Sequence, residues 1–249
     1  MKGQAAGVPA LTGDGGQLLA GIATAIERVV GSVAEVAGAM TALAATAGAG
    51  RRPLRRADLV TLRPLVDQVL ARHRGFVAGA GMVLAPGALA DAPRWIDWWW
   101  ADQGLGPGQL EVDLDPGSAE FYDYTTTEWY REPERTGQPC IAGPYVDFIC
   151  TREYTFTVSV PVLDAERFVG VAGADILADE VERMLLPELC RLGNRPAVLV
   201  SGNGRVIASS SASILPGEVI GAAGRGRTGH LAWPDTVTAA GPLPWMLLS

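Results

Sequence analysis

The chain has 249 residues and a formal net charge of −7, and hydrophobic residues make up 48% of it against 19% charged residues. These proportions predict a folded globular protein and exclude a disordered chain. The acidic balance provides no general electrostatic attraction for nucleic acid or for an anionic membrane surface, so neither is expected as a partner.

The first predicted element is a long helix whose apolar residues alternate at spacings of three and four positions. This a/d repeat is typical of a coiled coil and predicts a homodimer that forms through the helix. A single amphipathic helix packed on its own domain would carry the same stripe, so both interpretations stay open. The stripe consists of Leu19, Ile22, Ile26, Val29, Val33, Val36, Met40 and Leu43.

No targeting or membrane-spanning segment is expected. Residues 1–16 are rich in glycine and lack a basic start followed by an apolar run. The charge-free stretch 36–50 is shorter than the roughly 20 residues that a spanning helix needs. The cysteines Cys140, Cys150 and Cys190 form no CxxC pair, and this sparse set fits core thiols in a reducing compartment. The sequence therefore predicts a cytoplasmic protein.

The remaining elements mix helices and strands without a regular alternation, which predicts an α+β fold. Helices are expected over 57–73 and 177–192, a strand pair interrupted by Gly79 and Gly81 within 76–84, and strands over 154–160 and 167–176. The first of these last two alternates apolar and hydroxyl residues and is predicted to be half-buried. A smaller sheet is expected from a hairpin over 197–209 and strands over 230–233, 236–240 and 245–248. The predicted parts are a helical segment 1–50, a larger domain 51–192 and a smaller one 193–249.

Motifs for catalysis are sparse. The two histidines, His73 and His230, lie near no nucleophile in sequence, and HExxH, CxxC and GxSxG do not occur. The stretch 224–229 matches GxGxxG, but a predicted strand follows it where a dinucleotide site needs a helix. We therefore expect no catalytic residue, no metal and no cofactor. An enzyme that uses an Asp pair as acid and base is a third hypothesis.

Aromatic and acidic side chains gather between residues 121 and 176. Tryptophan and tyrosine faces attract cations, and a carboxylate completes the neutralisation of a positively charged guest. Four tryptophans lie within 95–100, where packing is expected for most and one or two could wall a pocket. Asp175 follows an apolar, glycine-containing strand, where a carboxylate is costly to bury unless it is paired. Asp175 either caps the following helix or contacts a ligand, and the spacing leaves both open.

Four motifs follow one another in this segment. They are Trp129-Tyr130, Pro144-Tyr145-Val146-Asp147, Thr157-Val158-Ser159-Val160-Pro161-Val162 and Gly170-Val171-Ala172-Gly173-Ala174-Asp175-Ile176. On these motifs the chain resembles the ligand-binding domains of the Cache superfamily, in particular the double-Cache sensors. The resemblance implies a long N-terminal helix, a PAS-like antiparallel sheet domain and a second, smaller PAS-like subdomain.

In the amino-acid-binding members of that superfamily, a Tyr and an Arg ahead of the Trp-Tyr pair bind the ligand's carboxylate, and later Asp residues bind its ammonium group. Tyr122 stands at the Tyr position, but Thr127 stands where the Arg is expected. A carboxylate prefers a bidentate guanidinium, so this departure favours an amine without an α-carboxylate, although the hydroxyls of 125–127 could still donate to one. The implied ligand-binding residues are Tyr122, Thr127, Trp129, Tyr130, Tyr145, Asp147 and Asp175.

Two function hypotheses follow. The first is a cytoplasmic sensor of a small amine or amino-acid-like metabolite, in which the long helix forms the dimer and carries the signal to a separate output protein. The second is a ligand-independent dimeric scaffold with the same fold. A ligand stabilises the folded state that binds it, so a thermal-shift screen with amines and amino acids separates the two.

Overall fold

The computed structural model describes residues 14–50, 52–100, 108–149, 153–192, 196–220, 237–239 and 245–248. The chain divides into two compact units. The larger unit comprises Glu27–Ala142 and Val146–Leu177, and the smaller one comprises Met1–Ile26, Gly143–Tyr145 and Ala178–Ser249. The mixture of helices with antiparallel sheets confirms the predicted α+β class.

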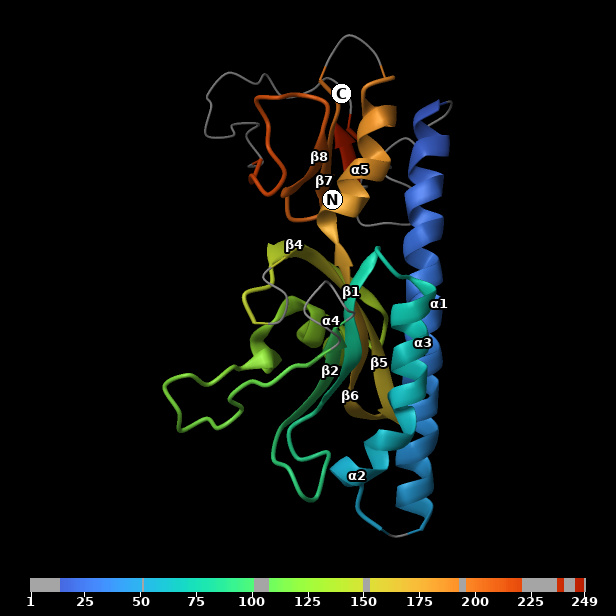
Figure 1. Cartoon of the computed structure of the whole chain (residues 1–249), viewed down its shortest axis with the longest axis vertical. Helices are drawn as coiled ribbons and strands as arrows, with labels where there is room; N and C mark the ends of the chain where they lie inside the picture. Colours follow the sequence, from blue (N-terminus) through green and yellow to red (C-terminus); the bar gives the residue numbers. More distant parts are fainter. Residues whose placement is uncertain are drawn as a thin grey trace, which may run out of the picture. The chain divides into compact units, whose positions relative to one another are not determined.

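The long N-terminal helix is present as α1, over Asp14–Ala49 (Figure 1). Its apolar stripe is buried within the chain, because Ile22, Ile26, Val29, Val33, Val36 and Met40 are each no more than 3% exposed. This burial favours the single amphipathic helix over the coiled coil. The homodimer stays a prediction, and in this conformation it would need a surface other than the stripe.

The predicted helix over 57–73 is present as three short helical segments, α2 over Arg56–Leu59, η1 over Val60–Leu62 and α3 over Arg63–Arg72. Pro64 lies in the first turn of α3, where a missing backbone N–H breaks no helical hydrogen bond. His73 ends α3, and its Nε2 lies 3.0 Å from the hydroxyl of Ser32 on α1. This hydrogen bond ties the two helices together.

A six-stranded sheet in the order β3-β2-β1-β6-β5-β4 forms the larger domain. Its strands are β1 over Val77–Leu84, β2 over Trp95–Trp100, β3 over Gly108–Gln109, β4 over Cys140–Val146, β5 over Tyr154–Asp164 and β6 over Arg167–Leu177. The predicted strand pair over 76–84 is wrong, because β1 is one continuous strand and every residue in it is buried. Instead of breaking the strand, Gly79 makes room for side chains and Gly81 for the backbone of β2.

Helices cover the two faces of the sheet (Figure 1). On one face α3 packs against β1, and its Arg63 stacks on the ring of Trp99. On the other face α4, over Glu128–Thr136, packs on β5 and β6. The prediction of a half-buried β5 is therefore wrong: its hydroxyl residues Thr155, Thr157 and Ser159 are no more than 2% exposed.

The smaller unit contains α5 over Ala178–Leu189 and a four-stranded sheet in the order β8-β7-β10-β9. The strands are β7 over Val198–Ser201, β8 over Val206–Ser209, β9 over Val237–Ala239 and β10 over Trp245–Leu248. The predicted hairpin is present, and Gly204 at its turn has a φ of +80°. The predicted strand over 230–233 and His230 lie outside the described residues.

The boundary between the two parts differs from the predicted one at 192/193. Helix α5 packs on β8 of the smaller sheet, so it belongs to the smaller unit, and the larger unit ends at Leu177. The cysteines also depart from the expected core thiols: Cys190 is exposed and Cys140 is half-buried. Cys150 lies outside the described residues.

Candidate functional site

Asp175 lies on β6 in the middle of the sheet. It is paired with Gly79 of β1 on one side and with Thr157 of β5 on the other. The Thr157 hydroxyl donates a hydrogen bond of 2.6 Å to its Oδ1, and the residue is 4% exposed. The helix-cap interpretation is therefore wrong. The carboxylate accepts its hydrogen bond from Thr157 on the neighbouring strand, and α5 begins only at Ala178.

The electrostatic setting of Asp175 disfavours its charge. Burial raises the pKa of its carboxyl to about 7, and the negative charge of nearby Asp147 adds to that rise, while hydrogen bonds from Thr157 and Trp98 lower it. Asp147 follows β4, is 9% exposed, and accepts a hydrogen bond of 3.1 Å from the backbone N–H of Ile149. Two buried carboxylates that influence each other are suited to a guest with positive charge.

Trp98 is a site residue that sequence reasoning did not single out from its neighbours. Alternation along β2 places Trp98 on the α4 face of the sheet and Trp99 on the α3 face. A Cβ built on Gly79 would lie 2.7 Å from Trp98 Nε1 and 3.5 Å from Asp175 Oδ2. The indole nitrogen and the carboxylate therefore both lie over Gly79.

Buried hydroxyls complete this face of β5. Ser159 donates a hydrogen bond of 2.6 Å to the backbone carbonyl of Trp129, which fixes α4 over the strand. The hydroxyl of Thr155, two positions from Thr157 on the same face, is buried and has no hydrogen-bond partner within the described residues. The alternation of hydroxyl and apolar residues along β5 is the sequence signal for this polar surface. It indicates a buried polar surface only once both faces of the strand are known to be covered.

The aromatic pair of α4 makes different contacts on its two sides, while its own rings meet edge-on at 6.3 Å. The backbone carbonyl of Trp129 accepts a hydrogen bond from Ser159, which is paired with Gly173 of β6. The ring of Tyr130 instead packs edge-on against Tyr124 at 5.3 Å and Phe168 at 5.4 Å. Phe168 lies at the start of β6, seven positions before Asp175. Tyr130 is thus part of an aromatic cluster at the far end of the strand.

The hydroxyls of the three consecutive threonines before α4 are all used within their own turn. Thr125 donates to the carboxylate of Asp123, Thr126 to the Asp123 carbonyl and Thr127 to the Tyr124 carbonyl, over 2.6–2.8 Å. Thr127 is also the N-cap residue, directly before α4 begins at Glu128. Their protons are therefore engaged already, and Arg94 nearby is paired with Asp123 at 3.0 Å.

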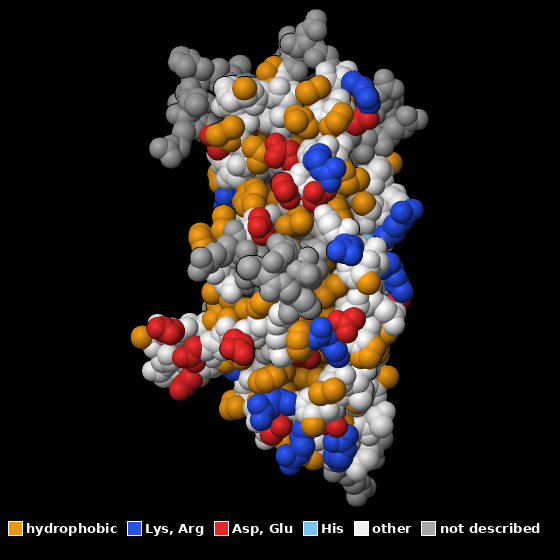
Figure 2. All heavy atoms as spheres, viewed as in Figure 1, with side chains coloured by type: hydrophobic (Ala, Val, Ile, Leu, Met, Phe, Trp, Pro, Cys, Tyr) orange, Lys and Arg blue, Asp and Glu red, His pale blue; other side chains and the backbone are white. Residues whose placement is uncertain are grey.

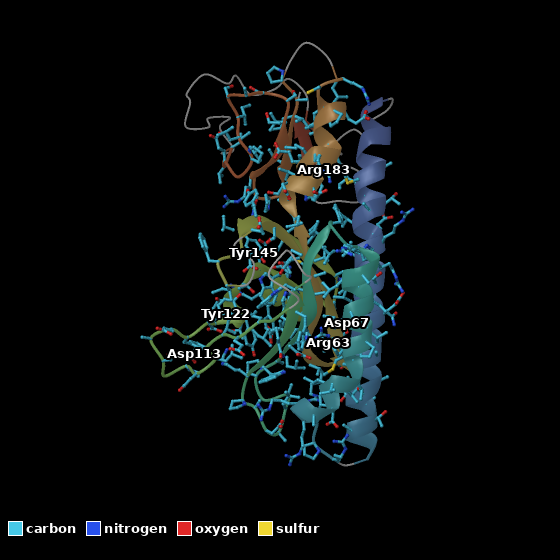
Figure 3. The ribbon with its side chains drawn as sticks, in the orientation of Figure 1. Arg63, Asp67, Asp113, Tyr122, Tyr145 and Arg183 are labelled. Carbon is cyan, nitrogen blue, oxygen red and sulfur yellow. The ribbon has the colours of Figure 1, made fainter. Side chains whose placement is uncertain are left out.

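The two remaining predicted residues are only half-buried. Tyr122 precedes the short helix η2, over Tyr124–Thr126, and its backbone N–H donates to the Asp113 carbonyl. Tyr145 lies on β4 within the part of the chain assigned to the smaller unit. Figure 3 labels both side chains. Of the seven predicted residues, Asp147 and Asp175 lie close enough for their charges to interact, and Trp129 is fixed over β5 by its backbone.

We expect Tyr130→Phe to raise the free energy of unfolding by about 1 kcal/mol, because the Tyr130 hydroxyl is buried without a partner within the described residues. Tyr124→Phe is the matched control, since the Tyr124 hydroxyl donates to the Leu84 carbonyl over 2.7 Å. The control should lose about 1 kcal/mol. Urea denaturation measures both, and equal losses for the two variants would contradict the assignment of an unpaired hydroxyl.

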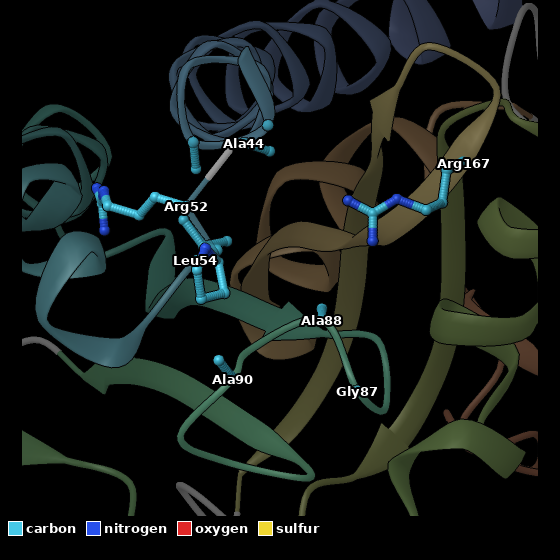
Figure 4. Close-up of a pocket in the computed structure, with 10 residues that line it drawn as sticks. Ala44, Arg52, Leu54, Gly87, Ala88, Ala90 and Arg167 are labelled. Carbon is cyan, nitrogen blue, oxygen red and sulfur yellow. The ribbon is translucent and has the colours of Figure 1, made fainter. Parts of the chain in front are cut away.

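Two other features offer less. Figure 2 shows acidic side chains gathered on a projecting segment, which carries the exposed residues Glu111, Asp113, Asp115 and Glu120. No group of three or more possible metal ligands forms within the described part of the chain. A hollow of about 270 Å³ beside the end of α1 is bordered by Arg52 and Arg167 (Figure 4), but these pair with Asp58 and Asp164 respectively.

Known proteins resemble this chain both in sequence and in fold. Residues 67–183 match the family of first PDC sensor domains of methyl-accepting chemotaxis protein-like proteins. The fold is that of a PDC sensor domain, of the Cache type. The larger unit of the chain, with its six-stranded sheet and the Asp175 site, coincides with most of this match. The predicted resemblance to Cache sensors is confirmed.

Similar proteins carry the same kind of domain. The chain is 30% identical over 122 residues to the methyl-accepting chemotaxis protein TlpQ of Pseudomonas aeruginosa, a match over 43% of this chain and only 17% of that protein. The ligand-binding domain of the Pseudomonas aeruginosa chemoreceptor PctC in complex with GABA is 18% identical, with a TM-score of 0.55 over 95% of each chain. The extracellular domain of the histidine kinase soHK1S-Z6 is 16% identical, with a TM-score of 0.51 over 76% of this chain and 74% of that one.

The predicted cytoplasmic location is wrong. The fold is shared with the extracellular domain of a histidine kinase, and the helix Ala20–Gly48 is long and apolar enough to cross a membrane by length and composition. The prediction failed because it considered only charge-free stretches, whereas a spanning helix tolerates the few charges found here at Glu27, Arg28 and Glu35. Buried helices of soluble proteins and signal sequences meet the same criteria, and much of the apolar face of α1 is buried.

Proposed function

We propose that this domain is the sensor of a chemoreceptor-type protein and that it binds a small primary amine beside Asp175. The observation that carries the proposal is a buried carboxylate without a cationic partner among the described residues, set beside a second carboxylate. An ammonium group between Asp175 and Asp147 would supply the missing charge. The hydroxyl of Thr155, which has no hydrogen-bond partner within the described residues, adds an acceptor for the ammonium group.

The turn before α4 supports a ligand without an α-carboxylate. A ligand carboxylate needs strong donors, yet the Thr127 position supplies a hydroxyl that already donates to the Tyr124 carbonyl. Arg94, whose guanidinium reaches this turn, is already paired with Asp123. GABA, the ligand in the PctC complex, has its amine on a carbon remote from its carboxylate, so its amine half is the part for which this chain has the groups.

The ligand class is tested with pairs that differ only in the carboxylate. We expect n-propylamine to raise the melting temperature of the purified chain at pH 8 more than GABA does, and isobutylamine to raise it more than L-valine does. An unpaired ligand carboxylate near two Asp side chains costs free energy, so each amine should bind at least about tenfold more tightly than its amino acid. Titration calorimetry gives the affinities.

Asp97→Asn serves as the control variant, because Asp97 is a buried carboxylate on the other face of the sheet, bonded to Trp99 and Gln109. It should leave the amine affinities unchanged, whereas Asp147→Asn should weaken them. Tighter binding of L-valine than of isobutylamine would reject the amine. Absence of a shift with every compound up to saturating concentrations would favour the ligand-independent scaffold.

The proposed setting is a sensor outside the cytoplasm that passes its signal to other parts of a receptor. The TlpQ match spans only 17% of that protein, so the output and its partners are not represented in the shared region. Ligand binding shifts a receptor between two states only through different affinities for them. Sensing, rather than catalysis, fits the family match, and the absence of an enzymatic activity stays a prediction.

A further inference from the structure

The indole of Trp98 spans two glycines of neighbouring strands. Its Nε1 lies 2.7 Å from the position of a Cβ on Gly79, and the far edge of its six-membered ring lies 3.1 Å from that of a Cβ on Gly173. A larger residue at position 79 would displace the ring, and one at position 173 would crowd it. Trp98 itself is 6% exposed, and the nitrogen end of its ring is the end beside Asp175 Oδ2. The two glycines thus set the ring in one orientation.

We propose that Trp98 is a positioning residue of the amine site, whose indole N–H holds the Asp175 carboxylate in its ionised, cation-accepting form. The inference rests on the proposed function and goes beyond it by naming how the site keeps a buried charge available. Thr157 Oγ1 occupies the other side of the carboxylate, at Oδ1. The two donors therefore approach different oxygens of the same group, as Oδ2 faces Gly79 and the indole.

The charges around Asp175 agree with this role. Burial and Asp147 both raise the pKa of Asp175, to about 7, and the hydrogen bonds from Thr157 and Trp98 are the influences that lower it. From the strands packed against Asp175, β5 contributes Thr157, β1 contributes Gly79 and β2 contributes Trp98, so Asp147 is the charged group acting on it within the described residues. Loss of the indole donor should therefore move the titration of Asp175 upward.

The test compares two tryptophans of the same strand. Trp98→Phe removes the donor to Asp175, and Trp99→Phe removes an equivalent donor, at 3.1 Å, to Asp97 on the opposite face. The titration of the Asp175 carboxyl is followed by carbon-13 NMR in the ligand-free chain, assigned with Asp175→Asn. Isobutylamine affinity is measured from pH 5.5 to 9, where an alkylammonium group keeps its charge because its pKa is near 10, like that of lysine.

We expect Trp98→Phe to raise two quantities by about one pH unit: the titration midpoint of Asp175, and the pH below which isobutylamine affinity is lost. One unit corresponds to the free energy of one hydrogen bond to a charged group. Near pH 9 the Trp98→Phe variant should bind isobutylamine within about twofold as tightly as the unchanged chain does. A variant whose site is merely distorted would bind more weakly at every pH. Trp99→Phe should leave both profiles in place. If Trp98→Phe does not fold, 3-benzothienylalanine at position 98 keeps the ring shape and removes only the N–H.

Each result decides a different claim. Midpoints that stay in place when the N–H of residue 98 is removed overturn the positioning role, even where isobutylamine binds. A shifted midpoint together with isobutylamine that fails to bind the unchanged chain at any pH overturns the proposed function and leaves the positioning role intact. Equal shifts in the Trp98 and Trp99 variants also overturn the inference, because a general loosening of β2 would then explain both.

Discussion

Asp175→Asn is expected to abolish amine binding and at the same time to stabilise the ligand-free protein at pH 8. The pKa of Asp175 is raised to about 7 in the folded chain, mainly by burial, against about 3.9 for an unfolded Asp. Ionising this group therefore costs the folded state on the order of 4 kcal/mol above pH 7. Asparagine carries no charge and keeps an oxygen for the Thr157 hydroxyl, but its NH2 group faces the Trp98 N–H, so we expect a gain of only about 2 kcal/mol.

The pH dependence gives the sign of this effect. Because the folded-state pKa of Asp175 is raised, the contribution of this residue to the stability of the folded chain is complete below the unfolded-state pKa. That contribution is lost as the pH rises through about 7, where the buried carboxyl must ionise. The difference in unfolding free energy between Asp175→Asn and the unchanged chain should thus grow from pH 4 to pH 8. Urea denaturation at several pH values measures it, with isobutylamine titrations beside it. A variant that is less stable at pH 8 would show that the buried charge is already compensated.

In the proposed amine site, Asp175 would destabilise the empty domain and supply the charge that binds the ligand. A ligand cation that neutralises Asp175 removes the cost of burying its charge, so binding and stability are coupled through this single carboxylate. Asp147 strengthens the coupling, because its charge opposes the ionisation of Asp175 until a cation arrives.

The sequence was sufficient to place Asp175 on a strand and to mark it as a costly carboxylate, but not to find its partners. Thr157 lies 18 positions away, and a count from Asp164 and Arg167, which close the β5–β6 hairpin, would place Phe156 opposite Asp175. A bulge between Val162 and Leu163 shifts the pairing by one residue and brings Thr157 opposite instead. Nothing in the residue pattern predicts that bulge, and a shift of one residue exchanges the faces.

Trp98 escaped prediction for a related reason. Four tryptophans lie within six positions, and alternation alone divides them between two faces without saying which face holds the site. The choice depends on helices far away in sequence: α3 covers Trp99 through Arg63, and α4 covers the face of Ser159. The α1 stripe shows the same limit, because its a/d spacing suits a partner helix and the chain's own domain equally well.

Gly170→Ala is expected to cause the largest loss of stability, about 3–5 kcal/mol. Gly170 follows the bulge, has a φ of +148°, and a Cβ there would lie 2.2 Å from the Val83 carbonyl oxygen of β1. The variant must strain its own backbone and also push β1 away from β6. For a chain of this length the loss corresponds to a fall in melting temperature on the order of 10 °C.

Gly87→Ala separates the two causes of that loss. Gly87 also has a positive φ, of +77°, but a Cβ on it would meet nothing within 4 Å, so only the backbone strain of about 1–2 kcal/mol applies. Calorimetry should therefore rank Gly170→Ala well below Gly87→Ala in stability. Because Gly170 holds the register that sets Asp175 between Gly79 and Thr157, any Gly170→Ala that still folds should also bind isobutylamine more weakly. Equal losses in the two variants would mean that the Val83 carbonyl can move aside and that β1 does not fix the pairing at the bulge.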